Sequence, residues 1–451
     1  MQQTLFQPKD YHHPKLYLFK QTKLGRIHDA IPWEELEDCL PVQDTSKPGP
    51  KPWFSNKGMF GLMFLKHLID TSDEKLIDRF NTDWSLQLFC GKLLGEGEMI
   101  RDQAMASRVR GYMAEHADWE AIQQVLLEHW KKDMESLHIL FMDATCYESY
   151  IRFPTDVKLL WECCQWIYDL IFKLCKLLGI KRPRNKFIDQ KRKQQAYSKL
   201  RRKTYKKGRR RHRSLVYLLE KGLDQLQGLF DAHPIVLTGK QTIYLKTIKQ
   251  VLSQQKVIQE DSSAKIPERI VSLHKPYIRP IVRGKENKPV EFGMKAHMLQ
   301  SGGVVWFDKM EFKAFNECKA LKTSFFKHTK HFGSCFQLAA DRIYATNENR
   351  NFLKGKGVFH SFAPKGRPVK DTKQAKPQAV LRQELNKVRS THLEGAFGNH
   401  KNHYGLRKVK ALSEKTEHIW VFFGVMSANA SKIADRKFKT NNKEPVLRSA
   451  A

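Results

Sequence analysis

The sequence is short of acidic side chains and lacks several common site motifs. Its 451 residues contain 47 Asp and Glu against 80 Lys and Arg, which gives a formal net charge of +33. The eight cysteines form no CxxC pair, which argues against a disulfide framework and against a cysteine-rich zinc site. No glycine-rich phosphate loop ending in Gly-Lys-Ser or Gly-Lys-Thr occurs, so a nucleotide cofactor is not expected.

No long apolar run in the sequence is without charged side chains. The most apolar stretch, residues 159–178, contains Glu162, Asp169, Lys173 and Lys176. This pattern is typical of an amphipathic helix and not of a membrane span. The sequence also starts without a basic segment followed by an apolar one, so a secretory signal is not expected. We therefore expect a cytoplasmic protein with no membrane partner.

The positive charge is concentrated in one segment. Between Lys181 and Arg213 the sequence has seventeen Lys or Arg residues and a single acid, Asp189. Such a density of charge attracts polyanions and indicates a nucleic-acid partner, although a solvated helix face has the same composition. The residues expected to contact DNA phosphates in this segment are Arg192, Lys193, Arg201, Arg202, Lys206, Lys207, Arg209, Arg210 and Arg211.

Three acidic residues occur in patterns that indicate metal-dependent phosphodiester chemistry. Two short apolar runs of strand character end at Asp143 and Asp341, and Glu394 lies in a region of helical composition, 377–403, that Gly405 follows. Carboxylates brought together in this way can hold two divalent cations about 4 Å apart. Oxygen ligands favour Mg²⁺, with Mn²⁺ as the alternative. Taken singly, each Asp could instead cap a turn and the Glu could be a solvated charge.

The order of the expected elements predicts an α/β fold with a ribonuclease H-like catalytic core. A strand carries Asp143, a hairpin of two strands lies near 288–308, a helix near 311–328, then a strand with Asp341 and a helix with Glu394. A large helical basic insertion interrupts this core, and an all-helical domain precedes it. The expected boundaries are 1–135 for a helical domain for DNA-end binding or dimerisation, 136–163 and 285–433 for the catalytic domain, 164–284 for the insertion and 434–451 for a flexible basic tail.

Five blocks of sequence carry a resemblance to a known family. They are GPKPWF at 49–54, Asp143-Ala-Thr, FGMKAH at 292–297, ADRIY at 340–344 and EGAFGNHK at 394–401. In these blocks the chain resembles the DDE transposases of bacterial insertion sequences, in the insertion-sequence-five group and its relatives.

The resemblance implies a transposase that cleaves DNA at the ends of a mobile element and transfers the strands into target DNA. Asp143, Asp341 and Glu394 would hold two Mg²⁺ or Mn²⁺ ions, and Lys401 would position a phosphate. The implied partners are double-stranded terminal inverted repeats and target DNA, bound by a homodimer. Nucleoid association in a bacterial cytoplasm is expected during activity.

The sequence departs from the signature of that family, which has Tyr, two residues, Arg, three residues, Glu, six residues and Lys. Glu394 and Lys401 match, whereas Ser390 and Lys387 occupy the Arg and Tyr positions. Arg389 is not expected to replace the arginine, because five residues of α-helix place it about 140° from Glu394 around the axis. Lys387, seven residues before Glu394, is expected to share its face and to contact DNA.

Two other functions are compatible with parts of the sequence. The changed signature would suit a catalytically inactive or domesticated transposase-derived protein that only binds DNA. The basic segment alone would suit an RNA-binding protein, but that function leaves the three carboxylates without a role.

Overall fold

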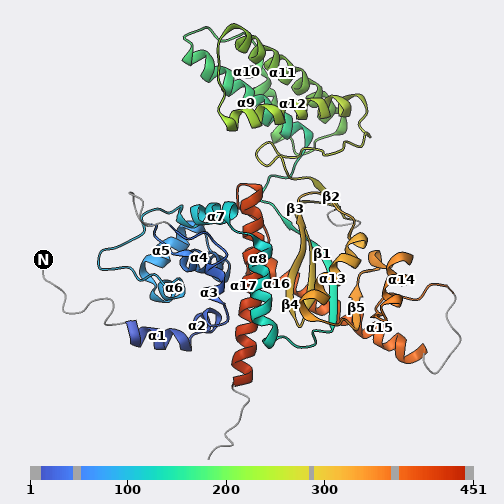
Figure 1. Cartoon of the computed structure of the whole chain (residues 1–451). Coiled ribbons are helices and arrows are strands. Elements are labelled where there is room, and N and C mark those ends of the chain that lie inside the picture. Colours follow the sequence, from blue (N-terminus) through green and yellow to red (C-terminus); the bar gives the residue numbers. More distant parts are fainter. Residues whose placement is uncertain (1–11, 44–51, 284–288, 367–374, 442–451) are drawn as a thin grey trace, which may run out of the picture. The chain divides into compact units, whose positions relative to one another are not determined.

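The protein is a mixed α/β structure, as predicted, and divides into two compact units. The computed structural model describes residues 12–43, 52–283, 289–366 and 375–441 (Figure 1). Within these residues, Ile151–Gly293 and Phe312–Ala314 form the second unit, and the rest forms the first. The second unit thus begins before the predicted insertion boundary at 164. The other predicted boundary, 284/285, lies outside the described residues.

Helices fill the described N-terminal part of the first unit. Several of these helices begin at a capping side chain. Ser72, for example, caps α5 by accepting a hydrogen bond from the backbone N–H of Lys75, and Leu76, Ile77 and Phe80 are the buried residues of that helix. The elements are α1 (His12–Gln21), α2 (Lys23–His28), α3 (Trp33–Glu37), α4 (Asn56–Ile69), α5 (Asp73–Thr82), α6 (Trp84–Phe89), α7 (Met105–His116), α8 (Trp119–Trp130) and η2 (Lys131–Asp133). The helical N-terminal region is therefore confirmed.

The sheet of the first unit has the order β4-β3-β1-β5-β6. Its strands are β1 (Ile139–Glu148), β3 (Val290–Ser301), β4 (Val304–Glu311), β5 (Gln337–Ala340) and β6 (Phe359–His360). β3 and β4 form the predicted antiparallel hairpin, whose turn needs Gly302 and Gly303 because both have positive φ angles, 55° and 79°. β5 pairs in parallel with β1 and with β6.

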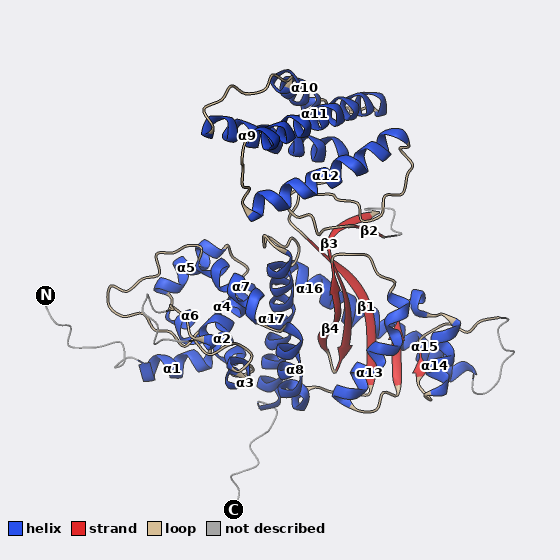
Figure 2. Cartoon of the chain, turned by 45° about the horizontal axis from the view of Figure 1, so that its top comes forward, coloured by secondary structure: helices blue, strands red, loops and turns tan. Residues whose placement is uncertain are grey.

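Helices and turns that follow the hairpin surround the parallel edge of this sheet. They are η3 (Glu317–Ala320), α13 (Leu321–Phe332), η4 (Arg342–Tyr344), α14 (Asn347–Gly355), α15 (Ala375–Arg389), the π-helix η5 (Ser390–Glu394) and α16 (Gly395–His403). The last helix, α17 (Glu414–Asn441), contacts both α4 and β4. It therefore lies between the N-terminal helices and the sheet (Figures 1 and 2).

The C-terminal part of the chain differs from the predicted flexible tail. Helix α17 continues through 434–441, because Ala434 is buried and Arg436 donates hydrogen bonds to the carbonyl oxygens of Gly302, at 2.6 Å, and Asp133, at 3.3 Å. Residues 442–451 lie outside the described residues. No helix in the described part of the chain is long and apolar enough to cross a membrane.

The second unit is a helical bundle with its own apolar core. Thr155 caps its first long helix, through a hydrogen bond from the N–H of Lys158. Leu160, Ile167, Leu215 and Ile248 are among the buried side chains that join its helices. The elements are α9 (Asp156–Leu177), α10 (Phe187–Lys199), α11 (Tyr205–Ala232) and α12 (Gly239–Glu260), with β2 (Pro280–Val282) pairing with the first residues of β3.

Candidate active site

Asp143 lies on β1, and Asp341 directly follows β5, the parallel strand next to it. The pairing of β1 with β5 ends at Met142 opposite Ala340, so the residues that follow this pair are Asp143 and Asp341. Backbones of paired strands are about 4.8 Å apart, which places both carboxyl groups in one region. One detail of the prediction is wrong: Asp143 lies within β1 and not at its end, because the strand continues as a buried segment to Glu148.

Arg389 connects Asp143 with Glu394. Its Nη1 lies 2.6 Å from Oδ2 of Asp143, and its Nη2 lies 3.3 Å from Oε1 of Glu394. The side chains of Arg389 and Asp143 are only 11% and 16% exposed, whereas that of Glu394 is 52% exposed. The described structure thus brings the third carboxylate to the same guanidinium as the first, although these residues are 251 positions apart (394 − 143).

The expectation that Arg389 points away from Glu394 is wrong, and a π-helix is the reason. Residues Ser390–Glu394 form a π-helix, in which hydrogen bonds join residues five apart and each turn holds about one more residue. Arg389 and Glu394 therefore lie on the same face. The same wide turn rotates Lys387 by roughly one residue, about 100°, from the face that it would share with Glu394 in a continuous α-helix.

Burial and neighbouring acids raise the pKa of the Asp143 carboxyl group. Burial, the largest cause, raises the pKa of its carboxyl group to about 6, and the charges of Asp341 and Glu317 add to the rise. Arg389 and the N–H of Ala144 act in the opposite direction. A carboxylate in this setting is stabilised by any additional cation that approaches it. Glu317 is an acidic neighbour that the sequence patterns did not reveal.

The carboxylates suit a hard divalent cation by their chemistry. Asp143, Asp341 and Glu394 offer only oxygen donors, and the first two are adjacent on the sheet. As the described side chains stand, no three His, Cys, Asp or Glu residues are grouped closely enough to hold a metal ion. The positive charge between Asp143 and Glu394 is that of Arg389. The oxygen donors are of the kind that Mg²⁺ and Mn²⁺ prefer, and in this structure the guanidinium of Arg389 contacts two of the three carboxylates.

Lys401 faces the same strand two residues beyond Asp143. Its Nζ donates a hydrogen bond of 3.0 Å to Oγ1 of Thr145, and alternate residues of a strand share one face of the sheet. Lys401 also lines a cavity of about 880 Å³ between residues 66–110 and 401–420. The lysine that the signature predicts is therefore on the side of β1 that carries Asp143.

Three exposed cations line this cavity without an ion pair in the described part of the chain: Lys75, Arg407 and Lys410. Lys66 and Arg110, in contrast, pair with Asp73 at 3.1 and 2.9 Å. A single bridge between Ser149 and Val409 holds the segment with Arg407 and Lys410 beside the end of β1. We call this region the basic cavity. Its cations come from separate short segments, so no charge run in the sequence predicted it.

The predicted DNA contacts outside this region are mostly exposed. Lys387 is exposed on α15, and so are eight of the nine predicted residues of the basic segment. The prediction is wrong for Arg211, which is buried in the second unit. Its guanidinium donates to Oε1 of Gln194 at 2.8 Å and to the carbonyl of Gln190 at 2.8 Å. Lys193 is exposed but pairs with Asp189 at 2.8 Å.

Comparison with known proteins finds two domain matches. Residues 338–425 match the family described as "Transposase DDE domain", which includes Asp341, Glu394 and Lys401. Residues 15–112 match "Transposase domain (DUF772)", which includes the helices on one side of the basic cavity. Over 147 residues the chain is 26% identical to the "Uncharacterized protein ORF8 in nfe locus" of Rhizobium meliloti, covering 32% of this chain and 70% of that protein. No solved structure matches the chain significantly.

Proposed function

This chain carries the DDE and DUF772 domains of transposases, consistent with a DDE transposase of insertion sequences, and we propose that it cuts the element's DNA ends and joins them to target DNA. The two domains indicate a function in DNA transposition, and the DDE domain implies a ribonuclease H-like core. The observation that carries the proposal is the adjacency of Asp143 and Asp341, with Glu394 linked to Asp143 through Arg389.

In this function Asp143, Asp341 and Glu394 would hold divalent cations. Two such ions, when bound, would activate a water and stabilise the leaving oxygen of an in-line displacement. The protein's own contribution is to hold the carboxylates within a strand, directly after a second strand and in a helix, and to limit the contact of Asp143 with water by burying it. Arg389 balances the charge of Asp143 and Glu394 and is within reach of a phosphate that approaches them.

Lys401 and the basic cavity bind the DNA backbone beside the reacting phosphate. Lys401 is fixed by Thr145, two residues from Asp143, and the exposed cations Lys75, Arg407 and Lys410 continue the positive surface away from it. Phosphate contacts of this kind position a duplex without reading its sequence. Both matched domains contribute to the cavity, so each would hold part of the same DNA end.

The second unit acts as an insertion between β1 and β3 that adds affinity for DNA through its exposed cations. Joining two element ends to one target requires that both are held together, so a homodimer on DNA is part of the proposal. The alternative, an inactive transposase-derived DNA-binding protein, was suggested by the missing signature arginine. Arg389 weakens the case for an inactive protein. It lies one residue before the signature position, 390, and its guanidinium contacts Asp143 and Glu394.

Removal of divalent cations is expected to abolish DNA cleavage. The test uses the full chain and DNA with the short inverted repeats that flank the coding region. In Mg²⁺ or Mn²⁺ we expect strand breaks with 3′-hydroxyl ends, and a chelator should prevent them until the ion is restored, because the divalent cations would activate the water and stabilise the leaving oxygen. The same DNA without the repeats is the control. Cleavage that persists in the chelator would contradict the proposal.

Lys401→Ala is expected to lower strand transfer about 10- to 100-fold, the equivalent of a hydrogen bond to a charged group worth about 1.5–3 kcal/mol. Lys387→Ala should change it by less than about twofold, because the π-helix turns this lysine away from Glu394. Strand transfer into plasmid DNA measures both variants. A larger loss in Lys387→Ala would show that the helix face is assigned incorrectly.

Replacement of six exposed cations of the basic segment is expected to flatten the salt dependence of DNA binding. Each phosphate contact contributes about −0.9 to the slope of log affinity against log salt, so six glutamines should reduce the slope by up to about 5. Preference for the correct ends over random duplex should remain, and an unchanged slope would indicate a merely solvated surface. The six residues are Arg192, Arg201, Arg202, Lys206, Lys207 and Arg210.

A further inference from the structure

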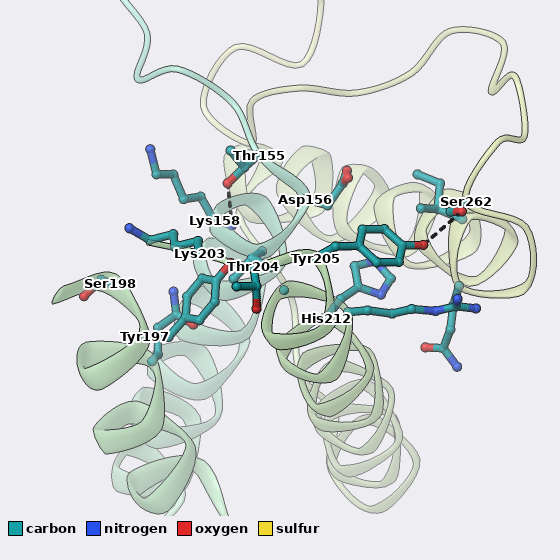
Figure 3. Close-up of a pocket in the computed structure, with 16 residues that line it drawn as sticks. Thr155, Asp156, Lys158, Tyr197, Ser198, Lys203, Thr204, Tyr205, His212 and Ser262 are labelled. Carbon is teal, nitrogen blue, oxygen red and sulfur yellow. Dashed lines mark hydrogen bonds between the residues drawn. The ribbon is translucent and has the colours of Figure 1, made fainter. Parts of the chain in front are cut away.

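A cavity of about 670 Å³ lies within the helical bundle of the second unit. It is formed where α9 and α11 begin and where α10 and α12 end (Figure 3). Its volume falls within the range of about 300–1,000 Å³ that is common for sites that enclose a small organic group. Two tyrosines, Tyr197 and Tyr205, contribute rings to its wall. The cavity can therefore hold a planar group against an aromatic surface.

Cations at this cavity keep their positive charge available. Lys158, Lys203 and Arg209 line it, and none of the three has an ion pair within the described residues. Lys158 and Lys203 donate to the backbone carbonyls of Phe153, at 3.3 Å, and Leu200, at 3.0 Å, which leaves their charges unneutralised. These two lysines extend on the side of the cavity where Tyr197 lies (Figure 3).

The acidic residue in the cavity wall does not oppose an anion. Asp156 accepts hydrogen bonds from Arg269, at 2.7 Å, and from Gln255, at 2.9 Å, so its charge is compensated by a residue outside the wall. The N-terminal ends of α9 and α11, 22 and 28 residues long, both meet the cavity. Their partial positive charges add to the field of the three cations. The rim is thus suited to phosphate.

A hydrogen bond fixes the aromatic part of the cavity wall. Tyr205 is 68% exposed, and its hydroxyl donates to Oγ of Ser262 at 3.2 Å, which holds the ring at the wall (Figure 3). A nucleobase has a flat face that can stack on such a ring.

We propose that this cavity binds one unpaired nucleotide of a DNA strand. The base lies against the rings of Tyr197 and Tyr205, and the phosphates on either side of it contact Lys158, Lys203 and Arg209. Stacking on an aromatic ring tolerates any base, so the site selects an unpaired nucleotide and not a sequence. The inference rests on the proposed function for its DNA substrate, but the site shares no residue with the three carboxylates.

The test compares the affinity of the full chain for two duplexes that differ only by a single unpaired nucleotide. The wild type is expected to bind the duplex with the unpaired nucleotide about tenfold more tightly, as one stacked base allows. Tyr197→Ala and Tyr205→Ala should remove this preference and leave affinity for the paired duplex unchanged. Tyr217→Ala is the matched control, because Tyr217 also lies on α11, is 66% exposed and is not in the cavity wall.

A second pair of variants tests the role of the cations in the cavity wall. Lys203→Gln is expected to reduce the preference severalfold, whereas Lys199→Gln, an exposed lysine outside the wall, should retain it. Absence of a preference in the wild type, or an equal loss in Tyr217→Ala, would overturn the inference. So would elimination of the preference by millimolar inorganic phosphate, which would identify a site for free anions.

The outcome is independent of the catalytic proposal. Thermal unfolding of each variant, matched to the wild type, shows that the bundle is intact. Asp143→Ala protein should keep the preference for the unpaired nucleotide, because its change lies in the first unit. A preference that survives while metal-dependent cleavage is not found would reject the proposed function and support this site. Metal-dependent cleavage by a protein that shows no preference for the unpaired nucleotide would support the proposed function and reject this site.

Discussion

Asp143→Ala, Asp341→Ala and Glu394→Ala are each expected to eliminate cleavage of DNA that carries the element ends, while binding of that DNA persists. Each substitution removes an oxygen donor from the set that holds the divalent cations. A loss of about 4 kcal/mol of transition-state stabilisation lowers the rate of cleavage about a thousandfold. Binding should remain because the basic cavity and the basic segment are unchanged. Gel-shift and cleavage assays on one preparation measure both properties.

Glu348→Ala is the matched control for these variants. Glu348 is an exposed acid on α14 that pairs with Lys322 at 2.6 Å, and it takes no part in the proposed site. Its removal should leave the cleavage rate within about twofold, as is usual for an exposed ion pair. Normal cleavage by any of the three carboxylate variants would remove that residue from the proposed ligand set, whereas loss of binding in all three would indicate a defect in folding.

Arg389→Ala is expected to lower both the stability of the metal-free protein and the rate of cleavage. The guanidinium and Asp143 are largely buried, so the substitution leaves a carboxylate without its counter-charge beside Asp341. Breaking a fully buried pair costs about 3–5 kcal/mol of unfolding free energy, and the partial exposure here reduces the expected loss to about 2–3 kcal/mol. Chemical denaturation in a chelator measures this loss.

Addition of Mg²⁺ distinguishes an electrostatic role of Arg389 from a merely structural one. A cation that replaces the guanidinium charge should stabilise Arg389→Ala more than the wild type, because binding to the folded state alone raises its stability. Arg389→Lys should recover only part of the stability lost in the chelator, since an ammonium cannot contact Asp143 and Glu394 with two separate groups. Arg382→Ala, on the same helix, is the control. Equal stabilisation of variant and wild type by Mg²⁺ would contradict this account.

Much of the frame around the site follows from local patterns in the sequence. The apolar runs before Asp143 and Asp341 do form paired strands, and the predicted hairpin is present as β3 and β4. Its turn of two glycines and the Thr155 cap of α9 are also local features. These features depend on residues near one another in the chain. Hydrophobic runs, turn glycines and capping side chains act locally, which is why they could be predicted without knowledge of the fold.

The geometry around Arg389 could not be predicted in the same way. A π-helix adds one residue to a turn, and no propensity in Ser390–Glu394 requires it. The wide turn lets Arg389 reach Asp143, which is 246 positions away in the sequence. The basic cavity and the burial of Arg211 are similar cases. Each depends on side chains from distant segments, such as the bridge at Val409 and the amide of Gln194.

Strand β1 sets the spacing between several of the proposed catalytic groups, because they are on the strand or contact it or a residue next to it. Alternate residues along it contact the C-terminal part of the chain: Asp143 contacts Arg389, Thr145 contacts Lys401, Tyr147 contacts His400, and Ser149, directly after the strand, contacts Glu417. Neighbouring members of this series are about 6.6 Å apart.

A gain or loss of one residue between Asp143 and Ser149 would turn every later member to the opposite face of the sheet. Lys401 would then lose its place relative to the carboxylates, although neither group had been altered. Functional copies of this chain should consequently keep the number of residues between Asp143 and Ser149 fixed.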